Sequence, residues 1–412
     1  MATGTRMPAY PAGTKLSPYF YLYVPSTDRI WIGSTEVGWT NADFPNAAPS
    51  TWAIVDPSNL SAIESWSAVE SVGTAGVHYE HWYDPVNDVV WAECYRSGPG
   101  AYRWIRWASD GSIELETDAA SNSVGLFPNE NTGDVYCIET DPSSGYRTRW
   151  IRKVNSDGTL GDTVADFAAG ITFALGAVDG SGNLWVHTTD GSHNREILLI
   201  DPVTYGQTSI WTDTGISNGI DSMCYDSVLD QMLIWRRYVG GGDNGSVLFI
   251  DCATSTAGAD IAVPATGDGW TLSHADLGEG PRFDPVRNLF WWVVEVPEVL
   301  ASNNVAINRA AVSFDTSAFA VVHVEPVVYY GPEIDLSVID DLVNDYADTY
   351  SVGYSGVLCT RSGARVYWCA WFEMWDDATS TYLYDLVFVQ WWEPDAPTGR
   401  RWVTININIR RR

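Results

Sequence analysis

Histidine and cysteine side chains are the first candidates for catalysis or metal binding in this sequence of 412 residues. Their spacing matches neither a CxxC pair nor a zinc-type cluster. The sequence also lacks a nucleophile elbow, a Walker loop, an HExxH motif and a dinucleotide fingerprint. A Ser-His-Asp set, whose members can lie far apart in a chain, stays open. The residues concerned are His78, His81, His187, His193, His274 and His323, with Cys94, Cys137, Cys224, Cys252, Cys359 and Cys369. We expect the cysteines to be free thiols buried in strands.

A repeated unit positions these residues. Each copy is an apolar strand, a turn rich in Asp, Pro, Asn or Gly, and a second strand with a large apolar residue at a fixed place. These apolar anchors recur at a basic period of about 48 residues, and they are Trp31, Trp91, Tyr136, Trp185, Leu233, Phe290 and Tyr367. Strands joined by short turns predict four-stranded antiparallel sheets, which bury both faces when they stack radially. On these repeats, the sequence resembles a seven-bladed β-propeller over nearly its whole length.

The repeats predict one all-β domain over 19–412, preceded by an N-terminal arm over 1–18. A helical insertion is predicted at 332–350, between the sixth and seventh blades. Within it, Ser337–Asp348 places apolar and acidic residues on opposite sides of a helix. Trp402–Ile409 alternates apolar and polar residues, as the outer strand of the last blade would. We therefore expect the ring to close by side-chain packing rather than by a swapped strand.

Aspartate recurs at the corners of the repeat, at Asp84, Asp201, Asp226 and Asp284. An Asp side chain accepts hydrogen bonds from backbone amides two residues further on, and a following Pro presets φ for a turn. The favoured interpretation is therefore that these residues form turns, and the alternative is ion binding.

The loops between the second and third strands of the predicted blades carry exposed-looking polar and aromatic groups. Such loops lie on one face of a propeller, and loops often carry function. The face is either a recognition surface or merely solvated, and a glycan or receptor would contact chiefly its aromatic residues. The candidates are Trp39, Phe44, His193, Asn194, Asp243, Asn244, Asp376 and Asp377.

One segment suggests enzymatic chemistry. Leu277-Gly-Glu-Gly-Pro-Arg-Phe-Asp-Pro285, followed by Leu289-Phe-Trp-Trp292, resembles the opening blade of gluconolactonase/senescence-marker propellers. The resemblance implies that Glu279 binds a divalent metal, and a second similarity, at 217–221, implies that Asn218 is a further ligand. A Ca²⁺- or Zn²⁺-type ion held there would polarise a lactone carbonyl and activate water. The alternative function is thus a metal-dependent lactonase or hydrolase.

The net charge of the chain argues against nucleic acid as a partner. The chain has 23 Lys and Arg residues against 52 Asp and Glu, a formal net charge of −29, and its only lysines are Lys15 and Lys153. Such a surface repels phosphate backbones, so we expect no nucleic-acid partner. No apolar run is long enough to span a membrane, and the N-terminus lacks the apolar region of a secretory signal.

These patterns favour a non-enzymatic scaffold or binding protein with no cofactor. The chain resembles structural or host-recognition propellers of tailed-virus virions, a likeness at the level of the fold. It implies a place in the virion, or otherwise in the cytoplasm. The expected partners are other virion proteins or a host surface receptor or glycan, and homo-oligomers are compatible with the pattern.

Overall fold

The structure is a computed structural model, and the chain divides into two compact units. Unit 1 comprises Met1–Trp66 and Pro264–Arg412, and unit 2 comprises Ser67–Val263. The described residues are 20–33, 50–56, 63–68, 75–96, 102–119, 123–144, 147–168, 171–190, 192, 194–214, 218–238, 246–262, 282–284, 286–302, 305–318, 320–326, 349–359, 366–376 and 381–392.

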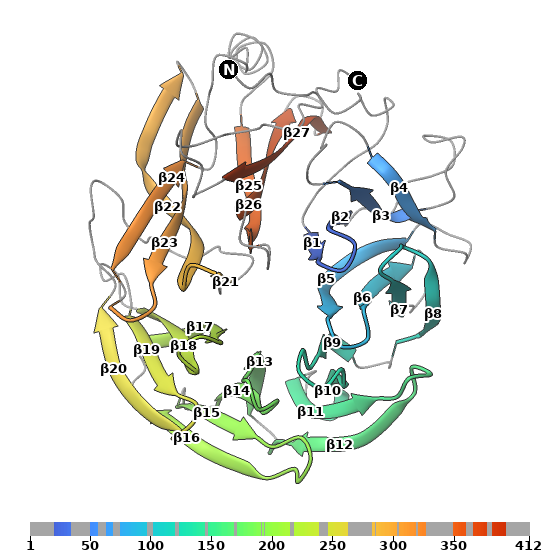
Figure 1. Cartoon of the computed structure of the whole chain (residues 1–412), viewed down its shortest axis with the longest axis vertical. Coiled ribbons are helices and arrows are strands. Elements are labelled where there is room, and N and C mark those ends of the chain that lie inside the picture. Colours follow the sequence, from blue (N-terminus) through green and yellow to red (C-terminus); the bar gives the residue numbers. More distant parts are fainter. Residues whose placement is uncertain are drawn as a thin grey trace. The chain divides into compact units, whose positions relative to one another are not determined.

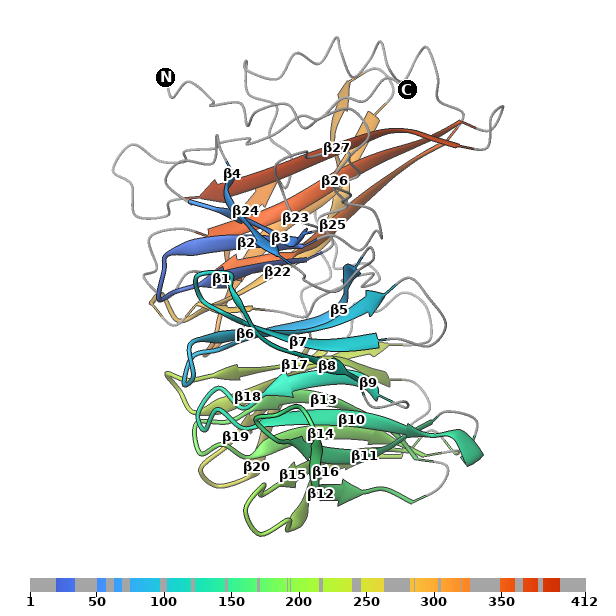
Figure 2. The same ribbon diagram turned by 90° about the vertical axis from the view of Figure 1, so that its right-hand side faces the viewer.

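Unit 2 contains four antiparallel sheets, each built from four strands that follow one another in the chain (Figure 1). The first two sheets contain β5 (Ala75–Asp84), β6 (Val89–Arg96), β7 (Tyr102–Ala108), β8 (Ile113–Asp118), β9 (Ser123–Pro128), β10 (Val135–Asp141), β11 (Arg147–Val154) and β12 (Leu160–Asp166). The next two contain β13 (Thr172–Val178), β14 (Leu184–Thr189), β15 (Arg195–Ile200), β16 (Gln207–Asp213), β17 (Asn218–Asp226), β18 (Gln231–Tyr238), β19 (Ser246–Asp251) and β20 (Thr256–Ala262). Successive sheets contact each other through strand pairs such as β5 with β9 and β13 with β17, and Figure 2 shows them stacked.

Unit 1 contains three further sheets among its described residues. Their strands are β1 (Phe20–Val24), β2 (Arg29–Gly33), β3 (Ser50–Val55), β4 (Ile63–Ala68), β21 (Arg282–Asp284), β22 (Leu289–Ser302), β23 (Val305–Asp315), β24 (Val321–Pro326), β25 (Thr349–Cys359), β26 (Val366–Asp376) and β27 (Thr381–Trp392). Consecutive up-and-down sheets of this kind are the blades of a β-propeller. The predicted all-β propeller fold is confirmed at this level.

The prediction of seven four-stranded blades is not met. The last sheet, β25–β27, has three strands within the described part of the chain. Its expected fourth strand, Trp402–Ile409, lies outside the described residues. The structure supports five blades of the predicted type rather than seven, namely the four sheets of unit 2 and β21–β24.

The predicted helix Ser337–Asp348 and the arm over 1–18 also lie outside the described residues. Within them, the structure has one short 3₁₀ helix, Pro142–Ser144, and no helix that is long and apolar enough to cross a membrane.

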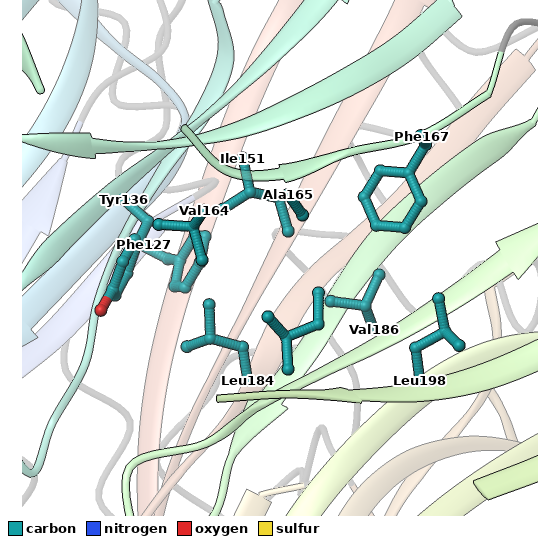
Figure 3. Close-up of a cluster of buried hydrophobic side chains, with 10 residues drawn as sticks. Phe127, Tyr136, Ile151, Val164, Ala165, Phe167, Leu184, Val186 and Leu198 are labelled. Carbon is teal, nitrogen blue, oxygen red and sulfur yellow. The ribbon is translucent and has the colours of Figure 1, made fainter. Parts of the chain in front are cut away.

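The core of unit 2 lies between successive sheets. Figure 3 shows side chains of β9–β12 and of β14 and β15 pointing toward one another. This cluster contains Phe127, Tyr136, Ile151, Val164, Ala165, Phe167, Leu184, Val186, Leu198 and Ile200. The predicted anchors Trp91, Tyr136, Trp185 and Leu233 are each at most 3% exposed. Large apolar side chains at one place in each second strand therefore pack sheet on sheet.

Aspartate closes the hairpins, as predicted for the corners. Asp84 Oδ1 accepts hydrogen bonds from the backbone N–H groups of Val86 (2.9 Å) and Asn87 (3.1 Å). Asp226 and Asp284 accept equivalent bonds from the amides two and three residues further on, and all three aspartates are at most 1% exposed. Asp201 accepts the same pair of bonds in the β15–β16 turn. The side chains satisfy backbone donors that the turn would otherwise leave unpaired.

A tyrosine–aspartate hydrogen bond closes three hairpins, two of which belong to the turns of Asp84 and Asp226. The Tyr83 hydroxyl donates to Asp88 Oδ1 at 2.8 Å, and Tyr225 donates to Asp230 Oδ1 at 2.9 Å. Tyr23 and Asp28 form the same pair in unit 1, at 2.7 Å. All three aspartates have left-handed φ angles, between 52° and 55°. Asp is among the few residues that tolerate this conformation, and the tyrosine hydrogen bond stabilises it.

Asparagine side chains tie turns of neighbouring sheets together in unit 2. The side-chain amide of Asn129, a fully buried residue, donates to the Gly182 carbonyl at 2.7 Å. Asn131 donates to the Asp179 carbonyl at 2.6 Å. These bonds link the β9–β10 turn to the β13–β14 turn, so the spacing of these two sheets is set by polar contacts at their ends as well as by the apolar core.

Candidate binding cleft between two sheets of unit 2

The predicted recognition loops fall mostly outside the described residues, which exclude Trp39, Phe44, His193, Asp243, Asn244 and Asp377. Asp376 is the last residue of β26, where it pairs with Thr381 of β27. Asn194 is the one candidate with a described side chain. Its backbone N–H and side-chain Nδ2 donate to the carboxylate of Asp190, at 2.9 and 2.8 Å. Asn194 therefore closes the turn between β14 and β15, and its amide is engaged within the chain.

The lactonase resemblance implied two metal ligands, Glu279 and Asn218. Glu279 lies outside the described residues. Asn218 is the first residue of β17 and pairs with Tyr238 of β18. Among the described residues, no group of three or more His, Cys, Asp or Glu side chains could hold a metal ion.

Burial shifts the pKa of a thiol and of an imidazole among the described residues. Cys137, Cys224 and Cys252 are free cysteines, and Cys137 is buried. Burial raises the pKa of the Cys137 thiol to about 12, so the thiolate does not form at neutral pH. Burial, followed by the nearby Arg195 charge, lowers the pKa of His187 to about 4, so its imidazole is neutral.

A cleft of about 530 Å³ opens between sheets β5–β8 and β9–β12 of unit 2. Its volume falls within the range of roughly 300 to 1,000 Å³ that is usual for small-molecule sites. The first sheet contributes Asn87, Val89, Trp91, Arg106 and Glu114, and the second contributes Thr132, Gly133, Asp134, Val135, Lys153, Val154, Asn155 and Ser156.

Each sheet places one ion pair in the cleft. Arg106 of β7 pairs with Glu114 of β8, with 3.1 Å between Nε and Oε2. Lys153 of β11 pairs with Asp134, just before β10, with 2.6 Å between Nζ and Oδ1. The four side chains are between 23% and 42% exposed, so they remain accessible from the cleft. Ion pairs this exposed add little to the free energy of unfolding. Their main effect here is to orient the four charged side chains in the cleft.

The Arg106 guanidinium is held on several sides. It lies over the Trp91 ring at 5.4 Å from the centroid, and Trp91 is only 3% exposed. Its Nη1 donates to the Ser156 carbonyl of the other sheet at 3.3 Å. A cation–π contact together with charge-assisted hydrogen bonds fixes the plane of a guanidinium. The cleft therefore presents this group in a defined orientation.

The rim of the cleft is formed where two turns meet. Asn87 Nδ2 donates to Asp84 Oδ2 at 2.7 Å and to the Gly133 carbonyl at 3.2 Å. Gly133 has φ +74°, and a Cβ added to it would lie 2.4 Å from Asn87 Nδ2. Only glycine combines this backbone conformation with so close an approach.

A buried carboxylate outside the cleft lining joins the same two sheets. Glu93 of β6 is 1% exposed. Its Oε2 accepts hydrogen bonds from Trp104 Nε1 at 3.0 Å and from the Ser123 hydroxyl of β9 at 2.8 Å. The contact holds β6 and β9 at a fixed separation, and it contributes to keeping the cleft preformed.

Sequence reasoning missed this cleft, although two signals were available. The third strands of the two sheets read Trp104-Ile-Arg-Trp107 and Trp150-Ile-Arg-Lys153, so the repeat replaces a tryptophan by lysine at one place. Lys153 is also one of only two lysines in the chain. A rare cation at an apolar position of a repeat marks a place where the blade does more than pack.

No protein-family model matches the sequence. No curated protein matches it either. Among solved structures, a prolyl endopeptidase is similar at a TM-score of 0.54 and 10% identity, over 92% of this chain and 50% of that one. An oligogalacturonate lyase from Vibrio parahaemolyticus is similar at a TM-score of 0.50 and 9% identity, over 80% of this chain and 77% of that one. At such identity, the similarity concerns the fold alone.

Proposed function

We propose that this chain is a ligand-binding β-propeller and that a small polar ligand occupies the cleft between sheets β5–β8 and β9–β12. The observation that carries the proposal is the arrangement of the cleft, into which two sheets each direct an ion pair. Arg106 bridges the sheets through Trp91 on one side and the Ser156 carbonyl on the other. Polar groups held in place in this way lose little freedom when a ligand binds.

Replacing Arg106 by Met is expected to abolish ligand binding, because it removes the most firmly held donor of the cleft. The measurement is saturation-transfer difference NMR on a mixture of mono- and disaccharides, amino acids and nucleosides. At least one component should bind the wild-type chain and lose its signal with R106M.

Arg149 offers a matched control. It pairs with Asp141 (2.6 Å) and Asp166 (3.0 Å) and lies over the Trp150 ring at 4.7 Å, but it does not line the cleft. R149M should bind the same component as the wild type. A mixture in which no component distinguishes R106M from R149M would rule out the cleft as the binding site.

A metal-dependent lactonase or hydrolase is the second candidate. It is supported by the Gly-Glu-Gly-Pro resemblance at Glu279 and by the similarity at 217–221, which includes Asn218. A Ca²⁺- or Zn²⁺-dependent lactonase activity that Glu279→Gln removes is the expected result for this candidate. Activity that survives both E279Q and chelation would exclude it.

A structural or host-recognition role in a tailed-virus virion, with protein, receptor or glycan partners, stays a prediction from the sequence. Its test is host attachment after Trp39→Ala. Loss of attachment with retained folding would support it, and unchanged attachment would count against Trp39.

A further inference from the structure

The cleft contains donors and acceptors in matched positions. In each of its two ion pairs, a cationic donor lies beside an anionic acceptor, at 3.1 Å for Arg106 and Glu114 and at 2.6 Å for Lys153 and Asp134. A guanidinium has five N–H donors and an ammonium has three, so neither cation is saturated by its partner. Each carboxylate likewise keeps further lone pairs. A ligand in the cleft therefore meets both kinds of group from each of the two sheets.

The type of ligand follows from which chemical groups can satisfy this set. A carboxylate or phosphate ligand only accepts hydrogen bonds, so it could bind the free donors of Arg106 and Lys153 but not the remaining lone pairs of Glu114 and Asp134. An ammonium ligand only donates, so it could bind the carboxylates of Glu114 and Asp134 but not the remaining N–H donors of Arg106 and Lys153. A hydroxyl group donates and accepts at once. Adjacent hydroxyls on a sugar ring place a donor and an acceptor side by side, as each ion pair does.

The charge of the chain argues against an anionic ligand. The formal charges of Arg106, Lys153, Glu114 and Asp134 cancel, whereas the whole chain carries −29. The field of the chain repels an anion at a distance, and the cleft has no net positive charge to reverse that repulsion. A neutral ligand is not repelled, and the hydrogen-bond argument above disfavours a cation.

We infer that the ligand of the cleft is a neutral saccharide of one or two rings, a conclusion that rests on the proposed function of the cleft. The volume of about 530 Å³ suits a molecule of this size. The hydroxyls bridge Arg106 to Glu114 and Lys153 to Asp134, and the Trp91 ring beneath the guanidinium keeps the donor in place.

Isothermal titration calorimetry with six probes tests the inference. The neutral probes are maltose, cellobiose and sucrose, and the others are digalacturonic acid, the unacetylated glucosamine dimer and amide-capped triglycine. At least one neutral disaccharide should bind, and the charged dimers should bind at least roughly tenfold more weakly. Lys153→Met should weaken the neutral ligand by roughly 10- to 100-fold, as expected for loss of a hydrogen bond to a charged group. Asp166→Asn, outside the cleft, should leave binding unchanged.

The double variant Glu114→Gln and Asp134→Asn sharpens the test, because it leaves the cleft with a net positive charge while preserving side-chain shape. Neutral disaccharides should bind it more weakly, and digalacturonic acid should bind it more tightly than it binds the wild type.

The outcomes separate the inference from the proposed function. One of the other three probes, digalacturonic acid, the glucosamine dimer or the peptide, could bind the wild-type chain best, with K153M weakening its binding. The inferred ligand class would then be wrong, and the assignment of the cleft as the binding site would remain. If no probe binds in a manner that depends on Arg106 or Lys153, the saccharide inference is wrong, and the comparison of R106M with R149M decides whether the cleft binds another ligand.

Discussion

Replacing Trp185 by Ala is expected to lower the free energy of unfolding by roughly 4 to 5 kcal/mol, at the upper end of the range for large-to-small core substitutions. Trp185 is fully buried and packs with Ile220, Met223 and other side chains of the next sheet. Its indole N–H also donates to Asp179 Oδ2 at 3.0 Å, and Asp179 is 2% exposed. The substitution thus opens a cavity between sheets and removes a donor from a buried carboxylate. Urea denaturation followed by circular dichroism measures the change.

Trp185→Phe is the matched variant. Phenylalanine keeps most of the apolar packing and loses only the N–H and part of the volume. We expect a loss of about 1 to 2 kcal/mol, because Asp179 retains bonds from the Ser181 and Asn183 amides. Equal effects of W185A and W185F would show that the hydrogen bond, rather than packing between sheets, dominates.

Replacing Glu93 by Ala is expected to cost roughly 3 kcal/mol. Two buried or half-buried donors, Trp104 Nε1 and the Ser123 hydroxyl, would lose their acceptor. An unsatisfied buried polar group costs about 1 to 3 kcal/mol, and the vacated volume adds to this. The same denaturation experiment measures the loss, and because Glu93 joins the two sheets of the cleft, ligand affinity should fall as well.

Glu93→Gln separates hydrogen bonding from charge. The glutamine carbonyl can accept both bonds, so E93Q should lie within about 1 kcal/mol of the wild type. If E93Q is as unstable as E93A, the negative charge itself is required. If E93A is as stable as the wild type, Glu93 does not hold the sheets together.

Much of the fold followed from local pattern. Trp31, Trp91, Trp185 and Phe290 were expected to be packing anchors, and each is buried. The corner aspartates were expected to form turns, and Asp84 accepts the predicted backbone bonds. These features depend on residues within one hairpin, or on a period that recurs along the chain, so sequence alone contains them.

The cleft could not be predicted in the same way. It depends on Arg106 and Lys153 facing a common space across two sheets, and that space is set by the contact of Glu93 with Ser123 and of Asn87 with Gly133. Sequence spacing does not encode such distances. The predicted recognition loops were chosen by length and exposure, and Asn194 shows the weakness of that criterion, because its polar groups hold a turn.

Chemical labelling of lysine tests the central claim, that the cleft binds a ligand, most directly. The chain has two lysines, Lys15 and Lys153, and Lys153 lines the cleft with a side chain that is 41% exposed. The intact protein is acylated with and without saturating maltose, cellobiose or sucrose. Mass spectrometry then measures the rate of labelling at each lysine. We predict that at least one of these sugars slows labelling of Lys153 severalfold and leaves Lys15 unchanged. Equal labelling of Lys153 with and without every sugar that calorimetry shows to bind would contradict the account.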